Sequence, residues 1–151
     1  MKNILCIVNP LSGLKKSLKV YYELENTIKE HSFNPKLLIT KYAGHARKVV
    51  SELQSDQFER ILIFGGDGTV NEVVNGLYQS DLCSFFPIGI IPTGSGNSVI
   101  HDIDCLDCNI ALKKALSNDI RLMDVNKAIF DNEVRLSISV IGWGMFSFGN
   151  V

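Results

Sequence analysis

The sequence has no long apolar run, and its charges almost cancel. No stretch approaches the roughly 18 apolar residues of a membrane-spanning helix, so no transmembrane segment is predicted. With 15 basic and 16 acidic residues, the net charge of −1 gives no support for a nucleic-acid partner. The apolar run Ile4–Val8 is too short for the core of a signal peptide. We therefore expect a cytoplasmic protein whose association with a membrane, if any, is peripheral.

Cysteine is scarce and poorly spaced for a structural metal site. The chain has four cysteines, of which Cys105 and Cys108 form a C-x-x-C pair with His101 upstream. A closed zinc site needs four ligands, and there is no second cysteine pair. Reduced thiols are a plainer interpretation than a metal or redox site, so we predict no metal ligand among them.

Two common phosphate-binding motifs are missing as well. The sequence contains neither a Walker-type G-x-x-x-x-G-K-[ST] loop nor a G-x-G-x-x-G turn after its first apolar run. It contains instead short apolar runs that alternate with stretches of helical spacing. Strands are predicted over residues 4–8, 36–40, 60–64 and 88–91, and helices over 14–30, 44–53 and 69–78. This alternation predicts an α/β fold, a three-layer and mostly parallel sheet with helices on both faces.

The character of the chain changes after about residue 118. Residues 120–130 and 133–140 are predicted to form two strands of an antiparallel hairpin, joined by a turn at Asp131-Asn132. An apolar stretch over residues 141–146 then has little sequence left to cover it. We predict one α/β domain over residues 1–118 and the start of a second, β-rich and truncated domain over residues 119–151.

Three of the four early strands end in loops of small or polar residues. In an open α/β sheet, ligands bind at the carboxyl ends of the strands, so these loops are expected to share one site. The first loop, Asn9–Gly13, precedes a helix whose N-terminal amides suit a phosphate. Lys15, Lys16 and Lys19 follow and could add positive charge, although a solvated basic face is the commoner explanation.

The segment Gly65–Thr69 is the most specific of these loops. Its three glycines permit backbone geometry that other residues resist. Asp67, which lies between them, has two chemical uses: it could bind Mg²⁺ together with phosphate oxygens, or accept a proton from an attacking hydroxyl. A simple turn with Asp67 as helix N-cap is the alternative. The last loop, Gly94–Ser98, is a weak signal by itself because such turns precede many helices.

Taken together, the motifs resemble one family. They are Asn9-Pro10-x-Ser12-Gly13, Thr40 with Gly44-His45-Ala46, Gly65-Gly66-Asp67-Gly68-Thr69-x-Asn71-Glu72-Val73-x-Asn75-Gly76, and Pro92-x-Gly94-Ser95-Gly96-Asn97. In this order, over about residues 3–146, they resemble the diacylglycerol kinase catalytic domain shared by sphingosine, ceramide and bacterial lipid kinases. The resemblance implies a fold like that of 6-phosphofructokinase and a β-sandwich second domain downstream. It also implies ATP and Mg²⁺ as cofactors, bound between the two domains.

The resemblance implies roles for individual residues. Asp67 matches the aspartate assigned as general base toward the lipid hydroxyl. The implied nucleotide-site residues are Asn9, Ser12, Gly13, Thr40, Gly65, Gly66, Asp67, Gly68, Thr69, Asn71, Glu72, Gly94, Ser95, Gly96 and Asn97. His45 is expected to be structural, at the start of a helix. The implied partners are ATP and a lipid substrate at a membrane surface, and a homodimer is a further expectation.

The sequence defines the acceptor lipid less well. Residues 94–97 and 139–146 resemble the sphingosine kinase branch, but that branch carries an acidic pair where this chain has Phe148 and Asn150. Two other readings stay open. One is an NAD kinase-like enzyme, which shares Gly65–Thr69 but not the motif at residues 92–97, and the other is a regulatory nucleotide-binding module. For this fragment we expect weak nucleotide binding and little or no turnover.

Overall fold

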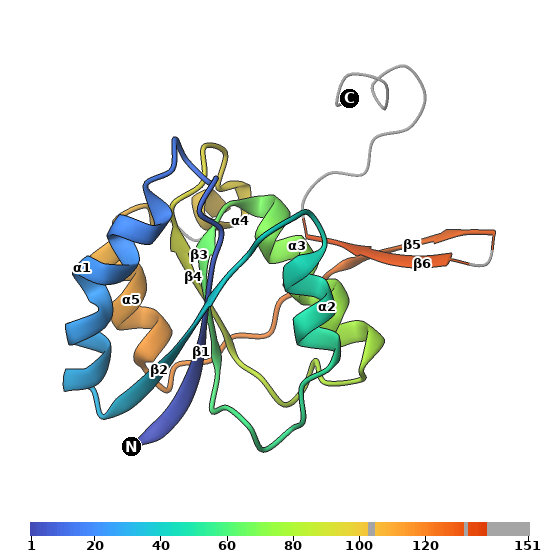
Figure 1. Cartoon of the computed structure of the whole chain (residues 1–151). Helices are drawn as coiled ribbons and strands as arrows, with labels where there is room; N and C mark the ends of the chain where they lie inside the picture. Colours follow the sequence, from blue (N-terminus) through green and yellow to red (C-terminus); the bar gives the residue numbers. More distant parts are fainter. Residues whose placement is uncertain (103–104, 132, 139–151) are drawn as a thin grey trace.

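The protein is built on a parallel four-stranded sheet. The computed structural model describes residues 1–102, 105–131 and 133–138 (Figure 1). The sheet has the order β2-β1-β3-β4, with β1 at Lys2–Val8, β2 at Phe33–Ile39, β3 at Ile61–Gly65 and β4 at Ile88–Pro92. From Ile4 onward β1 is a continuous buried apolar run, and β3 is buried throughout, because both faces of the sheet are covered.

Helices cover both faces of this sheet, as Figure 1 shows. One layer contains α1 (Ser17–Glu30), α4 (Ser98–Asp102) and α5 (Cys108–Leu116), and the other contains α2 (His45–Ser51) and α3 (Asp67–Gln79). The predicted three-layer α/β fold is therefore confirmed. The helix α5 was not among the elements expected from sequence. Asp107 begins it by accepting hydrogen bonds from the backbone N–H groups of Asn109 and Ile110, both at 2.9 Å.

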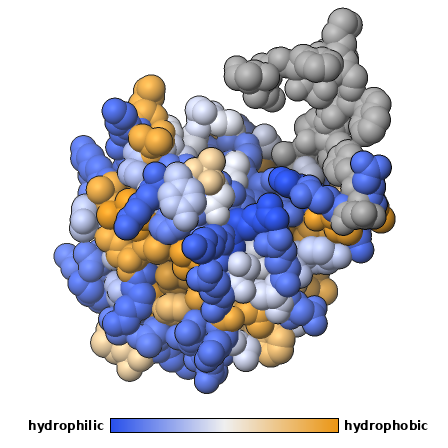
Figure 2. Space-filling view, turned by 45° about the vertical axis from the view of Figure 1, so that its right-hand side comes forward, coloured by the Kyte–Doolittle hydropathy of each residue, from blue (hydrophilic) through white to orange (hydrophobic). Residues whose placement is uncertain are grey.

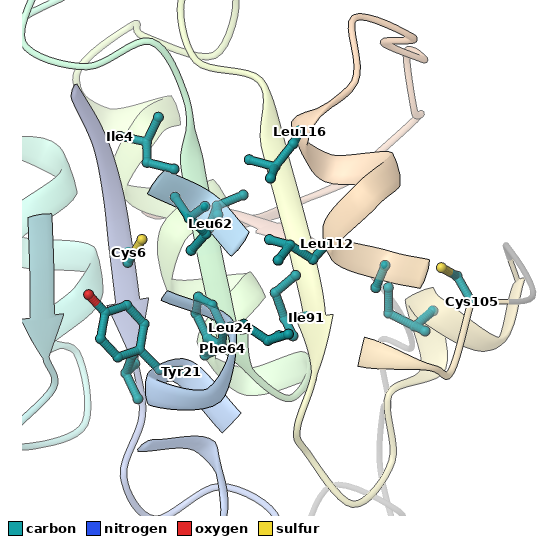
Figure 3. Packing of buried hydrophobic residues seen from close by; sticks show 14 residues of the cluster. Ile4, Cys6, Tyr21, Leu24, Leu62, Phe64, Ile91, Cys105, Leu112 and Leu116 are labelled. Atoms are coloured by element: carbon teal, nitrogen blue, oxygen red, sulfur yellow. The ribbon is translucent and has the colours of Figure 1, made fainter. Parts of the chain in front are cut away.

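The core on the α1 side of the sheet is closely packed (Figure 3). The rings of Tyr21 and Phe64 meet edge to face with their centroids 5.4 Å apart. Burial raises the pKa of the Cys6 thiol to about 12, so Cys6 packs as a neutral, small apolar side chain. Cys105 is buried in the same cluster, and Cys108 Sγ lies 3.6 Å from the Pro92 carbonyl oxygen. In the described part of the chain, no three His, Cys, Asp or Glu residues are grouped to hold a metal.

A two-stranded hairpin follows the α/β layers. It consists of β5 (Asn126–Phe130) and β6 (Glu133–Ser137), paired antiparallel. The prediction that the first strand begins at residue 120 is wrong, because residues 120–125 are exposed and pair with no strand of the described chain. Residues 139–140, which the second predicted strand included, lie outside the described residues.

The hairpin is attached to α3 by one buried amide. Asn75 Oδ1 accepts a hydrogen bond from Leu136 N, and Asn75 Nδ2 donates to Leu136 O, both at 2.9 Å. The side chain thus pairs with β6 in the way a neighbouring strand would, while Leu136 packs into the core beneath α3.

The surface of the molecule is mostly hydrophilic on the face shown in Figure 2, where apolar residues form separate patches. None of the helices in the described residues has the length and apolar character needed to cross a membrane.

Candidate functional site

The loops that follow β1 and β3 are tied together by side-chain hydrogen bonds. These two strands are neighbours in the sheet and parallel, so their carboxyl ends lie at the same edge. Asn9 Nδ2 donates to Thr69 Oγ1 at 3.1 Å, and the backbone N–H of Gly66 donates to Ser12 Oγ at 3.2 Å. The predicted polar residues of the first loop therefore fix the position of the glycine segment.

The loop after β4 is held to the same place by Asp67. Asp67 Oδ2 accepts hydrogen bonds from Ser98 N at 3.0 Å and from Ser98 Oγ at 3.1 Å, and Oδ1 accepts a longer one from Val99 N at 3.4 Å. Asp67 is the first residue of α3, so its carboxylate joins the starts of α3 and α4. The structure thus brings all three predicted loops together at one edge of the sheet.

Gly94 allows the two glycine loops to cross in backbone contact. A Cβ at Gly94 would overlap Gly66 Cα and would lie 2.7 Å from Asn97 Oδ1. Asn97 braces the same turn, because its Oδ1 accepts from Gly94 N at 3.0 Å and its Nδ2 donates to Gly94 O at 2.8 Å. Asn97, predicted as a nucleotide contact, therefore shapes the loop from within.

Two buried hydroxyls that sequence reasoning missed reinforce this arrangement. Ser17 Oγ, at the start of α1, donates to Thr93 Oγ1 at 2.8 Å, and neither residue is exposed. This bond ties the loop after β1 to the loop after β4. The one signal in the sequence is the position of Thr93, inside the motif Pro92-x-Gly94, where a polar residue directly follows a buried strand.

The three loops enclose a hollow of about 460 Å³, which we call the glycine hollow. Its lining consists of Asn9, Leu11, Ser12, Gly13, Gly66, Asp67, Gly68, Thr69, Gly94, Ser95 and Gly96. The first turn of α3 presents backbone N–H groups here that the helix cannot pair internally. Such amides, at the positive end of a helix dipole, suit an anionic ligand.

A second hollow of about 380 Å³ adjoins the first, and we call it the side hollow. Its lining consists of Asn9, Pro10, Leu11, Thr40, Lys41, Tyr42, Ala43, Gly68, Thr69 and Glu72. Tyr42 is 56% exposed, and its ring lies against the His45 ring with the centroids 4.8 Å apart. His45 is the first residue of α2, as expected, and its Nδ1 accepts from Lys41 N at 3.2 Å.

Most of the predicted nucleotide-site residues line one of these hollows. The exceptions are Gly65, Asn71 and Asn97. Gly65 is the buried end of β3, and the backbone carbonyl of Asn71 accepts a hydrogen bond from Asn75 Nδ2 at 2.8 Å. In this structure these three residues lie outside the lining of both hollows.

The fold and the site define a diacylglycerol kinase-like α/β domain. The crystal structure of a diacylglycerol kinase from Bacillus anthracis matches with a TM-score of 0.70 and 28% identity, over 82% of this chain and 42% of that one. The chain belongs to the diacylglycerol kinase catalytic domain family, whose model matches residues 3–128.

Relatives within the family carry lipid kinase names. A Streptococcus pneumoniae protein named "Putative lipid kinase" is 40% identical over 66% of this chain and 33% of its own length. Sphingosine kinase 1 of Arabidopsis thaliana is 28% identical over 95% of this chain and 32% of its own length. The chain therefore spans about a third of the length of these relatives.

Proposed function

We propose that the protein containing this chain transfers the γ-phosphate of ATP to the hydroxyl of a lipid, of the sphingoid-base or diacylglycerol type. The observation that carries the proposal is the glycine hollow, in which backbone amides and small side chains of three interlocked loops converge. Amides arranged in this way suit the oxygens of a polyphosphate. Phosphoryl transfer depends mainly on positioning and on neutralising charge, and family membership supplies the reaction class.

The two hollows suggest how ATP lies. The phosphates suit the glycine hollow, and the nucleoside suits the adjoining side hollow, where the Tyr42 ring and Thr40 form part of the wall. Four residues line both hollows and therefore mark the boundary between the two parts of the ligand: Asn9, Leu11, Gly68 and Thr69.

Mg²⁺ belongs to the same proposal, and Asp67 is the residue that would hold it. Mg²⁺ is often bound by one or two carboxylates together with substrate phosphates, and Asp67 is a carboxylate in the lining of the glycine hollow. The ion would neutralise charge on the phosphates. One carboxylate is enough for such a site, because phosphate oxygens of the nucleotide would provide further oxygen ligands for the ion.

Acting as general base is the other role proposed for Asp67. Its Oδ2 is occupied by two hydrogen bonds from Ser98, whereas Oδ1 receives only the long contact from Val99 N. Oδ1 is therefore the oxygen available to a lipid hydroxyl. Ser98 and Val99 orient the carboxylate for this role.

The direct test uses a full-length protein that contains this chain. Labelled ATP would be offered with a panel of sphingoid bases, ceramide, monoacylglycerols and diacylglycerols. Phosphorylation of one of these lipids is expected. Phosphorylation of NAD in their place would favour the NAD kinase-like alternative, and nucleotide binding without any transfer would favour the regulatory module.

We propose a cytoplasmic location with peripheral contact to membranes. The exposed loop between β1 and α1 is the feature that supports the membrane contact. Leu11 and Leu14 are 74% and 100% exposed, and Leu14 and Lys15 both have positive φ angles. Exposed Lys15 and Lys16 add positive charge next to these leucines. The double variant L11S/L14S should bind anionic phosphatidylglycerol vesicles more weakly, whereas the exposed-site control Leu122→Ser should not. If the wild type, the double variant and the control bind the vesicles equally, Leu11 and Leu14 do not contribute to membrane binding.

We propose that residues 119–151 begin a second, β-rich domain that presents the lipid. Its hairpin is attached to α3 through Asn75. A homodimer stays a prediction, which sedimentation equilibrium of the full-length protein would test.

A further inference from the structure

Glu72 is one of the predicted nucleotide-site residues and lines the side hollow, and both oxygens of its carboxylate accept hydrogen bonds from the start of α2. Glu72 lies on α3, and Oε1 accepts a hydrogen bond from Gly44 N at 2.8 Å while Oε2 accepts one from Ala46 N at 3.1 Å. The two oxygens thus satisfy two backbone N–H groups at the start of α2, which the helix cannot pair itself. Hydrogen bonds to a charged acceptor are stronger than neutral ones.

Close packing of α2 on α3 makes this contact possible. A Cβ at Gly76, one turn after Glu72, would lie 2.7 Å from the Arg47 carbonyl oxygen and 2.9 Å from Val50 Cβ. The two helices therefore meet with backbone near backbone, so a side chain from α3 reaches the first turn of α2. Figure 1 shows α2 and α3 side by side on the same face of the sheet.

The segment that Glu72 holds is the wall of the side hollow. Residues 40–43 line that hollow, and Gly44, which donates to Glu72, ends the segment. We propose that Glu72 is a positioning residue that fixes residues 40–44 and so sets the affinity for the nucleoside part of the nucleotide. This inference rests on the proposed function, because it takes the side hollow as the nucleoside site.

The test compares two ligands, ATP and inorganic tripolyphosphate, on the wild type and the variant Glu72→Gln. A glutamine keeps one acceptor oxygen but places an NH₂ group against the second backbone N–H, so the segment should lose its anchor. We expect affinity for ATP to fall about tenfold. Affinity for tripolyphosphate, which fills only the glycine hollow, should change less than about twofold. A purely structural role would lower both affinities together.

The matched control is Gln79→Ala. Gln79 Oε1 accepts from Arg47 Nε at 3.0 Å, so it also joins α3 to α2, but at the end of α3 away from the hollow. This variant should keep both affinities. A loss of ATP affinity equal to that of the Glu72 variant would overturn the inference.

A second measurement separates positioning from direct contact. In the ligand-free protein, hydrogen exchange at the Gly44 and Ala46 amides should be at least about tenfold faster in Glu72→Gln than in the wild type. Unchanged exchange would overturn the inference, whatever happens to nucleotide affinity. If the wild type binds neither ligand, the proposed function itself fails. If it binds both and the variant binds ATP as tightly as the wild type does, only the role of Glu72 fails.

Discussion

The glycine hollow and the side hollow lie next to each other at one edge of the sheet, but they are built differently. The glycine hollow is formed by loops whose backbones touch at Gly66 and Gly94 and are joined by Asp67. The side hollow has a wall of side chains, including Tyr42, on a segment that ends at Gly44, whose backbone N–H donates to Glu72. The first arrangement leaves no room for a side chain at Gly94, whereas the second is formed by side chains on a segment whose end is hydrogen-bonded to one carboxylate. We therefore expect the two hollows to respond differently to mutation.

The largest effect is expected from Asp67→Asn in the full-length protein. The amide can still accept one hydrogen bond from Ser98, so the loops should remain joined, but it cannot accept a proton. Turnover should fall by about 10²–10⁴-fold, while the Kd for ATP changes by less than about threefold. The exposed-site control Asp124→Asn should behave as the wild type. Retained turnover in Asp67→Asn would contradict the general-base assignment.

Gly94→Ala should disrupt the glycine hollow. The added methyl group would overlap Gly66, so one of the two loops must shift, and affinities for ATP and tripolyphosphate should fall together by about 100-fold. Leu122→Ala, at a fully exposed position outside both hollows, is the control and should keep both affinities. A loss of ATP affinity alone would show that the hollows have been assigned the wrong way round.

Asn75→Ala should release the hairpin from α3 without altering either hollow. The change removes both hydrogen bonds to Leu136 and leaves two buried backbone groups unpaired, at a cost of about 1–3 kcal/mol. Hydrogen exchange at the Leu136 amide should therefore accelerate by about 10- to 100-fold, with nucleotide affinity retained. Exchange that stays at the wild-type rate would mean that other contacts hold the hairpin, namely the packing of Leu136 and the Lys127 ammonium over the Tyr78 ring.

Tyr42→Ala should have the smallest effect, and only on the nucleoside side. Removing the ring takes away one wall of the side hollow, so the Kd for ATP should rise about three- to tenfold while that for tripolyphosphate stays the same. Tyr22→Ala is the control, since Tyr22 is a similarly exposed tyrosine on α1. An equal change in the two Kd values would place Tyr42 outside the nucleoside site.

The sequence predicted the sheet because buried parallel strands leave a simple pattern. The inner strands contain the unbroken apolar runs 4–8 in β1 and 61–64 in β3, and each run ends in a polar or glycine loop. β2 begins at Phe33, three residues before the predicted start at residue 36, and therefore includes Pro35. As β2 is an edge strand, hydrogen-bonded to β1 alone, it accommodates the proline.

Contacts between distant residues could not be predicted in the same way. The Ser17–Thr93 hydroxyl pair and the anchoring of Gly44 by Glu72 join residues far apart in the chain, and neither has a local pattern. The strand predicted from residue 120 failed because β propensity alone does not supply a partner strand. The motifs therefore predicted that three loops meet at one edge of the sheet, and the structure brings them together there. Only the structure separates residues that line the hollow, such as Ser95, from residues behind the lining, such as Asn97.

The most direct test of the account is to titrate this chain with ATP in the presence of Mg²⁺ and follow its backbone amides by NMR. We predict the largest shifts at residues 65–69 and 94–97, smaller shifts at residues 40–44, and none in β5 or β6. Because binding by this chain alone is expected to be weak, the titration should extend to millimolar nucleotide. Shifts centred elsewhere, or none at the glycine hollow, would contradict the central claim that this hollow binds the phosphates of ATP.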